Sequence, residues 1–494
     1  MIRKKYANLL YILGSLMIVL GIIMLIPLVV GFVLREGGNV YRSFIYPAVF
    51  SLVGGFCLNR LNNHEVDIDL RTGMILCTAG WLLSSLIGSI PFQIGLDKSF
   101  IDAFFEAVSG FTTTGITVFQ NLEQIPFSIL LWRSLIQWLG GLGILTFFLL
   151  VTFRSGGGIW RLFTAESHKI NSSRPVPNLF KSIEILWGIY LVFTIAQFVI
   201  LMVLQVGAGD AIIHSLTTIS TGGFSGYDSS IGHFQSMGHP YYRLIEYVII
   251  FFMLAGGINF LVHYQVFKGR VRELFSNGEM KYFWRIIIIF LLVIIAGHYI
   301  EGQYFDIKTL EEVFRKSLFQ VTAVMTTTGY ETQHIGSSFF PVAARQLFLV
   351  LMLIGGCVGS TSGGVKVMRI SVLSKMLLRE MKKVSFPKRA VMPIIIDKKI
   401  IAKEEISRIV AIFFSWILLI LVGGVITALF SDLSAGRAVS GMFSAVGNIG
   451  PFYFSVEEMS EMCSIVKATY ILGMLAGRLE IIPIFILFNK KTWQ

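Results

Sequence analysis

Four segments of the chain repeat one pattern: IDAFFEAVSGFTTTGIT (101–117), DAIIHSLTTISTGGFS (210–225), RKSLFQVTAVMTTTGYE (315–331) and GRAVSGMFSAVGNIGPF (436–452). Alignment on Gly115, Gly223, Gly329 and Gly450 puts a small residue twelve positions upstream in every copy. Each segment predicts an apolar helix of about ten residues, followed by a threonine-, serine- and glycine-rich stretch that breaks the helix. Because a membrane span needs roughly 20 residues, such a helix enters the membrane without crossing it. The pattern predicts four re-entrant half-helices, each followed by an extended loop at membrane depth.

The composition excludes a soluble protein. Of the 494 residues, 54% are hydrophobic and 14% are charged, whereas soluble domains carry about 25% charged residues. Apolar runs long enough to be considered as spans lie at 8–34, 44–58, 73–96, 127–152, 183–206, 243–267, 284–300, 345–372, 406–430 and 466–488. We therefore expect an all-α integral membrane protein with about ten transmembrane helices.

The half-helices divide these spans into repeats, because each half-helix lies between two of them. The predicted units are an N-terminal helix pair at 1–68 and four span–pore loop–span repeats at 69–153, 183–268, 281–375 and 404–489. Irregular backbone at membrane depth is tolerated only where protein buries it or where it lines a watery path. Four such segments at equivalent places indicate a shared axis, so we predict one pore with four loops around it.

The loops carry the groups that an alkali ion needs. Half-helices that point their C-terminal ends at the axis direct partial negative charge there, which favours a cation. Backbone carbonyls and threonine hydroxyls are hard oxygen ligands that replace the hydration shell of an ion, as in potassium filters. The residues predicted to bind potassium are Thr113, Thr114, Gly115, Thr221, Gly222, Gly223, Thr327, Thr328, Gly329, Asn448, Ile449 and Gly450. The fourth copy lacks threonine at this place, and Gly447 is an alternative anchor for its alignment.

The distribution of charge predicts the orientation in the membrane. Basic residues cluster at 3–5, 154–182, 268–285, 366–403 and 490–491, and all five clusters fall on one side when the spans alternate. The positive-inside rule puts that side, with both termini, in the cytoplasm. Acidic residues gather on the opposite side, where they either concentrate cations at a pore mouth or are ordinary solvated loop charges. The net charge of +12 has the same origin, and we expect no nucleic-acid partner.

Polar and small residues interrupt several predicted spans. The glycine-rich stretch 355–364 predicts a broken helix that faces the pore or other protein, or else a small-residue face for close helix packing. Arg478 lies deep in the last span, where a charge is costly and indicates a function. Its alternative is a structural pair with Glu480 or with backbone carbonyls. The glycines of 140–143 and Gly256–Gly257 predict hinge or close-packing sites in repeats one and two.

Two titratable residues, Glu106 and His214, occupy equivalent positions nine before the aligned glycine in the first two half-helices. The third and fourth copies have Gln320 and Gly441 there, so no fourfold ring of charge exists. We expect these side chains to stabilise the packing around the loops.

The motifs resemble the Trk/Ktr/HKT superfamily of potassium transporters. The matching pieces are TTTGI (112–116), STGGFS (220–225), TTTGY (326–330), GNIGP (447–451), GGCVGSTSGGVKVMR (355–369) and GMLAGRLEIIP (473–483). The resemblance covers nearly the whole chain, and the extra helix pair near 8–58 is similar to the TrkH/TrkG type, since the KtrB type generally lacks it. It implies four repeats around one pore, with an intramembrane gate loop and a pore-facing arginine below the filter. The gate residues so implied are Gly355, Gly356, Gly359, Ser360, Thr361, Ser362, Gly363, Gly364, Lys366 and Arg478.

The same resemblance implies potassium uptake across a bacterial inner membrane by a multi-pass protein. It also implies a homodimer and a TrkA-type cytoplasmic nucleotide-binding subunit, for which the basic loops offer a docking face. A potassium symporter coupled to sodium or protons is the alternative. Serine in place of the first filter glycine accompanies sodium transport in plant members, so Gly115 favours potassium. The chain contains no phosphate loop, zinc pattern or nucleophile motif, so we expect no enzyme and no cofactor, with potassium as the substrate.

Overall fold

A computed structural model describes residues 2–60, 70–143, 179–301, 307–387, 392–397, 399–479 and 481. The protein is predominantly helical, which confirms the predicted all-α membrane fold class. The exception within the described residues is an antiparallel pair of two-residue strands, β1 (Ile395–Ile396) and β2 (Lys399–Ile400). The basic segment 154–178, Glu480 and the C-terminal lysines at 490–491 lie outside the described residues.

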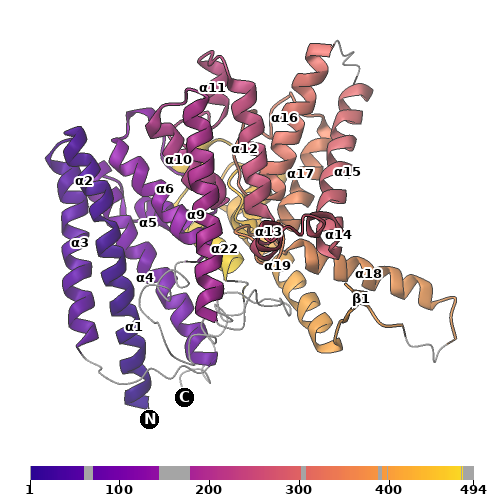
Figure 1. Ribbon diagram of the computed structural model, residues 1–494, viewed down its shortest axis with the longest axis horizontal. Coiled ribbons are helices and arrows are strands. Elements are labelled where there is room, and N and C mark those ends of the chain that lie inside the picture. Colours follow the sequence, from indigo (N-terminus) through magenta and orange to yellow (C-terminus); the bar gives the residue numbers. More distant parts are fainter. Residues whose placement is uncertain are drawn as a thin grey trace.

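The N-terminal unit consists of α1 (Ile2–Ile23), α2 (Leu25–Leu34) and α3 (Gly38–Asn59). Pro27 has no N–H to donate one turn back, which accounts for the interruption between α1 and α2. Helices α1 and α3 approach closely because Gly14 and Gly55 face each other, and a Cβ on either would come within 3.0 Å of the other helix. Small residues permit such approach in membranes, where apolar burial alone does not drive association. This unit stands at one side of the molecule, opposite α15 and α18 (Figure 1).

Each of the four following units contains a long helix, a half-helix and a short second helix. The first has α4 (Leu70–Leu96), α5 (Phe100–Phe111), the 3₁₀ turn η1 (Leu122–Gln124) and α6 (Phe127–Gly141). The second has α9 (Leu179–Val203), α10 (Ala208–Ile219), α11 (Gly232–Ser236), α12 (Tyr242–Gly257) and α13 (Phe260–Phe267). The third has α14 (Glu273–Ser276), α15 (Gly278–Ile300), α16 (Ile307–Met325), α17 (Val342–Ile354) and α18 (Val367–Lys383). The fourth has α19 (Lys403–Leu429), α20 (Ala435–Gly447), α21 (Val456–Glu461) and α22 (Ser464–Arg478).

The half-helices α5, α10 and α20 contain 12, 12 and 13 residues, close to the predicted length. Helix α16 contains 19 residues, because a charged first half precedes the apolar part. Glu312 in that half pairs with Lys316, and Glu311 pairs with Arg315, so i,i+4 ion pairs extend the helix beyond the apolar run.

Among the described residues, six helices are long and apolar enough to cross a membrane, or seven if the bent pair α12–α13 is one span. Helices also lie in the remaining apolar runs, but α6, α17 and α22 contain only 15, 13 and 15 described residues. The number of ten spans therefore stays a prediction. The apolar run at 345–372 is not one helix, since helix stops at Ile354 and resumes at Val367.

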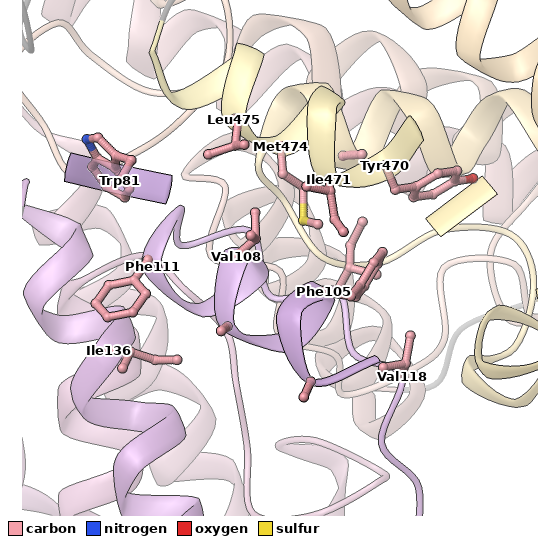
Figure 2. Close-up of a cluster of buried hydrophobic side chains, with 14 of the residues drawn as sticks. Trp81, Phe105, Val108, Phe111, Val118, Ile136, Tyr470, Ile471, Met474 and Leu475 are labelled. Carbon is pink, nitrogen blue, oxygen red and sulfur yellow. The ribbon is translucent and has the colours of Figure 1, made fainter. Parts of the chain in front are cut away.

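The second helix of each unit packs on the half-helix of the next: α6 on α10, α12 on α16, α17 on α20, and α22 on α5. The last of these contacts joins the end of the chain to its first unit. Figure 2 shows Phe105 and Val108 of α5 facing Ile471, Met474 and Tyr470 of α22 in one buried apolar cluster. This packing closes the four units into a cycle, with the half-helices inside.

Candidate functional site

The four loops after the half-helices share one unusual backbone. The residue two before the aligned glycine, called position −2 here, has positive φ in every copy: 54° at Thr113, 52° at Thr221, 56° at Thr327 and 53° at Asn448. The aligned glycines also have positive φ, at 80°, 76°, 76° and 114°. Non-glycine residues adopt this region rarely, so its fourfold recurrence indicates a backbone that the surrounding structure imposes.

The backbone hydrogen bonds at the ends of the half-helices are also the same in all four copies. The position −2 N–H donates to the carbonyl three residues back, at Gly110, Thr218, Val324 and Ala445. The position −1 N–H donates to the carbonyl five residues back, at Ser109, Thr217, Ala323 and Ser444. The fourth copy follows this pattern only when Gly450 is aligned with Gly115, because Gly447 is the last residue of helix α20. The backbone therefore aligns the fourth loop on Gly450.

The loops contact one another in a closed order. A Cβ on Gly115, Gly223 or Gly329 would lie within 3.0 Å of the position −1 carbonyl oxygen of the next loop, at Gly222, Thr328 and Ile449 respectively. On Gly450 it would lie 3.2 Å from the carbonyl oxygen of Thr114, in the first loop. At each aligned glycine, the backbone of the next loop thus comes so close that it leaves little or no room for a side chain. The result is a ring of four loops that brings together all twelve residues predicted to bind potassium.

The side chains of the loops are buried and bonded to one another. Thr112 and Thr114 share a hydroxyl hydrogen bond of 2.7 Å, and Thr326 and Thr328 share one of 2.8 Å. Asn448, which stands where the other copies have threonine, donates to the Thr114 hydroxyl at 2.9 Å. The amide thereby links the fourth loop to the first.

Buried polar contacts connect the half-helices to the segments beyond the loops. Glu106 accepts hydrogen bonds from Thr117 at 2.9 Å and from the Val118 N–H at 3.1 Å. It also forms an ion pair of 2.7 Å with Arg133 of α6, with both side chains at most 1% exposed. A second Arg133 nitrogen donates to the Ser225 carbonyl at 3.0 Å, so this arginine ties the first loop to the second.

His214 plays the corresponding part in the second copy, where its Nε2 lies 3.2 Å from Ser225 Oγ. This contact joins the same two positions as Glu106 and Thr117, and it accords with the expected packing role of both residues. Within the described part of the chain, Gln320 and Gly441 make no such contact. Instead, the space beside Gly441 is taken by the Tyr470 hydroxyl.

The third and second copies are joined by Tyr330, whose hydroxyl lies 2.5 Å from Thr217 Oγ1. The Thr217 carbonyl in turn accepts the N–H groups of Gly222 and Gly223. Tyr330 is fully buried, with 0% exposure.

Glycines near the ends of the second helices let these helices approach the loops. A Cβ on Gly140 would strike the Phe111 backbone, one on Gly257 would strike Thr326, and one on Gly477 would strike the Val446 backbone. Gly140 and Gly257 belong to the glycine pairs predicted as hinge or close-packing sites, and the geometry is that of close packing.

The glycine-rich stretch 355–364 forms a non-helical loop directly beneath the ring, which we call the lower loop. Its Gly363 N–H donates to Thr327 Oγ1 at 2.7 Å, and its Thr361 hydroxyl donates to the Ile219 carbonyl at 3.0 Å. A Cβ on Gly363 would strike the Gly447 carbonyl. The lower loop therefore contacts the second, third and fourth copies at once.

The lower loop also satisfies helix ends that would otherwise carry unpaired carbonyls. Helix α12 ends at Gly257, and its Gly256 and Gly257 carbonyls accept N–H groups from Thr361 and Cys357 at 3.3 and 3.0 Å. The last carbonyls of a helix have no partner within the helix, and an unpaired one is costly when buried. The chain bends by 105° between α12 and α13, so no further helical turn donates to these carbonyls. The lower loop supplies the donors instead.

Three charged side chains hold the lower loop. Arg478 donates to the Thr361 carbonyl at 2.7 Å and, with its other terminal nitrogen, to the Gly140 and Gly141 carbonyls at the end of α6. Lys366 donates to the Ser362 carbonyl. Glu279 of α15 accepts from the Val358 N–H at 2.7 Å. The arginine therefore pairs with backbone carbonyls, which was one of the two alternatives for it, and it does so next to the ring.

Acidic residues on the side opposite α18 have mixed roles. Asp102 pairs with Lys467 at 2.5 Å, and Asp228 accepts from the N–H groups of Asn121 and Leu122. The Ser455 N–H and the Arg437 guanidinium hold the pKa of Glu458 below its usual value, so this exposed carboxylate stays charged. Part of the predicted acidic surface is thus used for ion pairs and capping.

Sequence reasoning missed Arg133, Gln137, Tyr330 and Glu279 as residues of the site. Arg133 and Gln137 carried a usable signal, because polar residues inside an apolar helix are costly and need a partner. Tyr330 and Glu279 carried none, since aromatic and terminal acidic residues are common in membrane helices and loops.

A family model, the sequences of known proteins and a solved structure all relate the chain to the same family. The TrkH family model, described as a cation transport protein, matches residues 39–494. The chain is 32% identical to an uncharacterised cation transporter of Methanocaldococcus jannaschii, over 98% of this chain and 96% of that protein. It is 31% identical to the Trk system potassium uptake protein TrkH of Escherichia coli K12, over 98% of each chain. The crystal structure of the potassium transporter TrkH from Vibrio parahaemolyticus aligns with a TM-score of 0.85 at 28% identity, covering 99% of this chain and 100% of that one.

The Glu106–Arg133 pair predicts a stability effect. Removing one partner of a buried ion pair leaves an unpaired charge and costs roughly 3–5 kcal/mol. We expect Arg133→Met to lower the midpoint of thermal unfolding of the detergent-purified protein, and Glu106→Gln in the same chain to recover part of the loss. Arg243→Met is the matched control, since Arg243 is 55% exposed and its ion pair with Glu311 is 3.8 Å long. An unchanged midpoint in Arg133→Met would contradict the structural role of the pair.

Proposed function

Since the chain belongs to the TrkH family of cation transport proteins, we propose that potassium crosses the membrane through the ring of four loops and that the lower loop gates this path. The protein is a multi-pass potassium uptake transporter of the Trk family rather than an enzyme. What the family membership leaves open is which residues bind the ion and which control its passage.

The closed ring is the observation that carries the proposal. The position −1 residues Thr114, Gly222, Thr328 and Ile449 form one level of the ring, and the carbonyl of each contacts the aligned glycine of the preceding loop. Carbonyl oxygens arranged around an axis replace the water shell of potassium. The half-helices α5, α10, α16 and α20 end immediately before these loops, so their partly negative C-terminal ends favour a cation at the same place.

The lower loop is suited to gating because it lies under the ring and is held by bonds that can be broken. Passage would require Gly363 and Thr361 to leave their partners in the loops above. Arg478 adds a positive charge beside the same path, which opposes a cation electrostatically. The contacts of Gly363 and Thr361 with the ring are hydrogen bonds to or from the backbone, although Cys357 of this loop also packs in an apolar cluster and must shift if the whole loop moves.

Inward flux is then driven by the membrane potential, worth about 2.3 kcal/mol per charge for each 100 mV. This mode requires no second ion site. Uptake that persists when the sodium and proton gradients are separately abolished would support it, and uptake that stops with either gradient would favour the coupled symporter.

The cellular context is part of the proposal, and family resemblance and charge support it. We place the protein in a bacterial inner membrane with both termini in the cytoplasm, as a homodimer that binds a TrkA-type nucleotide-binding subunit. The support in the described residues is the basic helix α18, which ends in Lys382 and Lys383 and leaves the bundle sideways (Figure 1).

The first prediction of the proposed function concerns selectivity. In Gly115→Ser the added Cβ meets the Gly222 carbonyl, so the ring must deform where the ion loses its water. We expect the purified variant in liposomes to take up rubidium with a weakened preference for potassium over sodium as competitor. Gly188→Ser is the matched control, because a Cβ there meets none of the described residues within 4 Å. An unaltered preference in Gly115→Ser would mean that the ion does not pass this ring.

The second prediction concerns gating. Arg478→Gln removes the charge and at least one of the hydrogen bonds that Arg478 donates to the Thr361 carbonyl and to the end of α6. We expect faster rubidium uptake into liposomes without any partner protein, with the potassium preference kept. Arg408→Gln, at an exposed position of α19, should leave the rate unchanged. Equal rates for Arg478→Gln and the wild type would contradict a gating role for the arginine.

A further inference from the structure

One position of the second helices breaks the fourfold pattern. Gly140, Gly256 and Gly477 are the last but one residues of α6, α12 and α22, and Gly355 directly follows α17. Three residues before these glycines, the chain has Gln137, Met253, Met352 and Met474. The three methionines are buried in apolar clusters with residues of the adjoining half-helices or loops: Met253 with Ala323, Met352 with Ile449, and Met474 with Val108. Gln137 is equally buried, at 0% exposure, although glutamine is costly in such a place.

Both polar atoms of the Gln137 amide bond to the second loop. Its Nε2 donates to the Gly222 carbonyl at 2.7 Å, and its Oε1 accepts from the Phe224 N–H at 3.0 Å. The two bonds lie on either side of Gly223, the aligned glycine of that loop. A side chain of the first repeat therefore holds the backbone of the second loop by hydrogen bonds to the residues before and after Gly223.

The second loop is also the one that lacks a side chain at position −1. It has Gly222 where the other copies have Thr114, Thr328 and Ile449. A Cβ on Gly222 would overlap the amide group of Gln137, whose nearest atoms lie within 3.0 Å of it. The glutamine thus occupies the space that belongs to the position −1 side chain in the other three loops.

The two departures from symmetry compensate each other. In the first and third loops the position −1 threonine bonds to the threonine two residues before it, which fixes the loop from within. Gly222 cannot do this, and a glycine in an extended loop is conformationally free. The Gln137 amide supplies from outside the restraint that the loop lacks.

We propose that Gln137 is a positioning residue for ion selectivity, which fixes the direction of the Gly222 carbonyl and so the diameter of the ring at the second loop. The proposal rests on the proposed function, because it concerns the same ring. Without the amide, the Gly222 carbonyl can turn or move outward, and the ring then accepts ions of other sizes. Arg133 separately ties this loop at the Ser225 carbonyl, so loss of Gln137 does not release the loop altogether.

The test uses rubidium uptake into liposomes that contain the purified full-length protein, with potassium, sodium and lithium as competitors. Three variants are compared with the wild type: Gln137→Met, Gly222→Thr, and the two combined. Methionine keeps the size of glutamine and is the residue of the other three repeats. In the double variant the second loop reads STTGFS, and the introduced hydroxyl can bond to Ser220 as in the first and third loops.

We expect Gln137→Met to reduce the preference for potassium over sodium by about tenfold, the size of effect given by the loss of hydrogen bonds of ordinary net strength. We expect Gly222→Thr alone to weaken uptake or preference, since the new side chain overlaps Gln137. We expect the double variant to recover most of the preference that either single variant loses.

Other results of this experiment distinguish a failure of the proposed function from a failure of the role of Gln137. A wild-type protein without potassium preference would overturn the proposed function itself. A selective wild type with an equally selective Gln137→Met would overturn only the role of Gln137. A purely structural role would lower the unfolding midpoint and the uptake of every ion alike, with the preference unchanged. If Gln137→Met does not fold, a double variant that folds and selects potassium supports the proposal, and one that folds without selecting overturns it.

Discussion

The site depends on one steric constraint: the place of a side chain at each aligned glycine is taken by the carbonyl of the next loop. At Gly115, Gly223 and Gly329 this approach is too close for any Cβ, and at Gly450 it is tight. Because the contacts run from each loop to the next and return to the first, none of the loops can take its shape without its neighbours. The positive φ at position −2 belongs to the end of each half-helix, where the N–H groups of positions −2 and −1 bond to carbonyls three and five residues back and the residue at the turn takes the left-handed region.

The contacts of Arg478 and of the lower loop can be explained by the terminal carbonyls of the second helices, which have no partner within their own helix. The second helices stop beneath the ring, so that the last turn of each exposes acceptors in a place with little water. Arg478 donates to the Gly140 and Gly141 carbonyls of α6, and the lower loop donates to the Gly256 and Gly257 carbonyls of α12. The groups proposed to gate the path therefore also complete the helix ends. Opening must release these carbonyls, either to water that enters with the ion or to new partners.

The sequence allowed the prediction of the membrane fold class, of the half-helices and of the break at 355–364, because helix length, apolar runs and glycine clusters are local signals. It could not fix the alignment of the fourth loop, since Asn448 replaces threonine there, and the backbone angles and hydrogen bonds are what identify its position. The predicted length of α16 was too short, because the prediction followed the apolar residues and the first half of this helix is charged. Arg133 and Gln137 stand out as polar residues in an apolar helix, but the partners of Gln137 and Tyr330, and the Ser225 partner of Arg133, lie in other repeats, which no local pattern encodes.

Crystals of the protein soaked in thallium or rubidium, with the anomalous signal recorded, would test the central claim most directly, because the ions themselves are located. The account predicts density on the axis of the ring, at the level of the carbonyls of Thr114, Gly222, Thr328 and Ile449, and displacement of that density by potassium. Density that avoids the ring in a preparation active in rubidium uptake would contradict it.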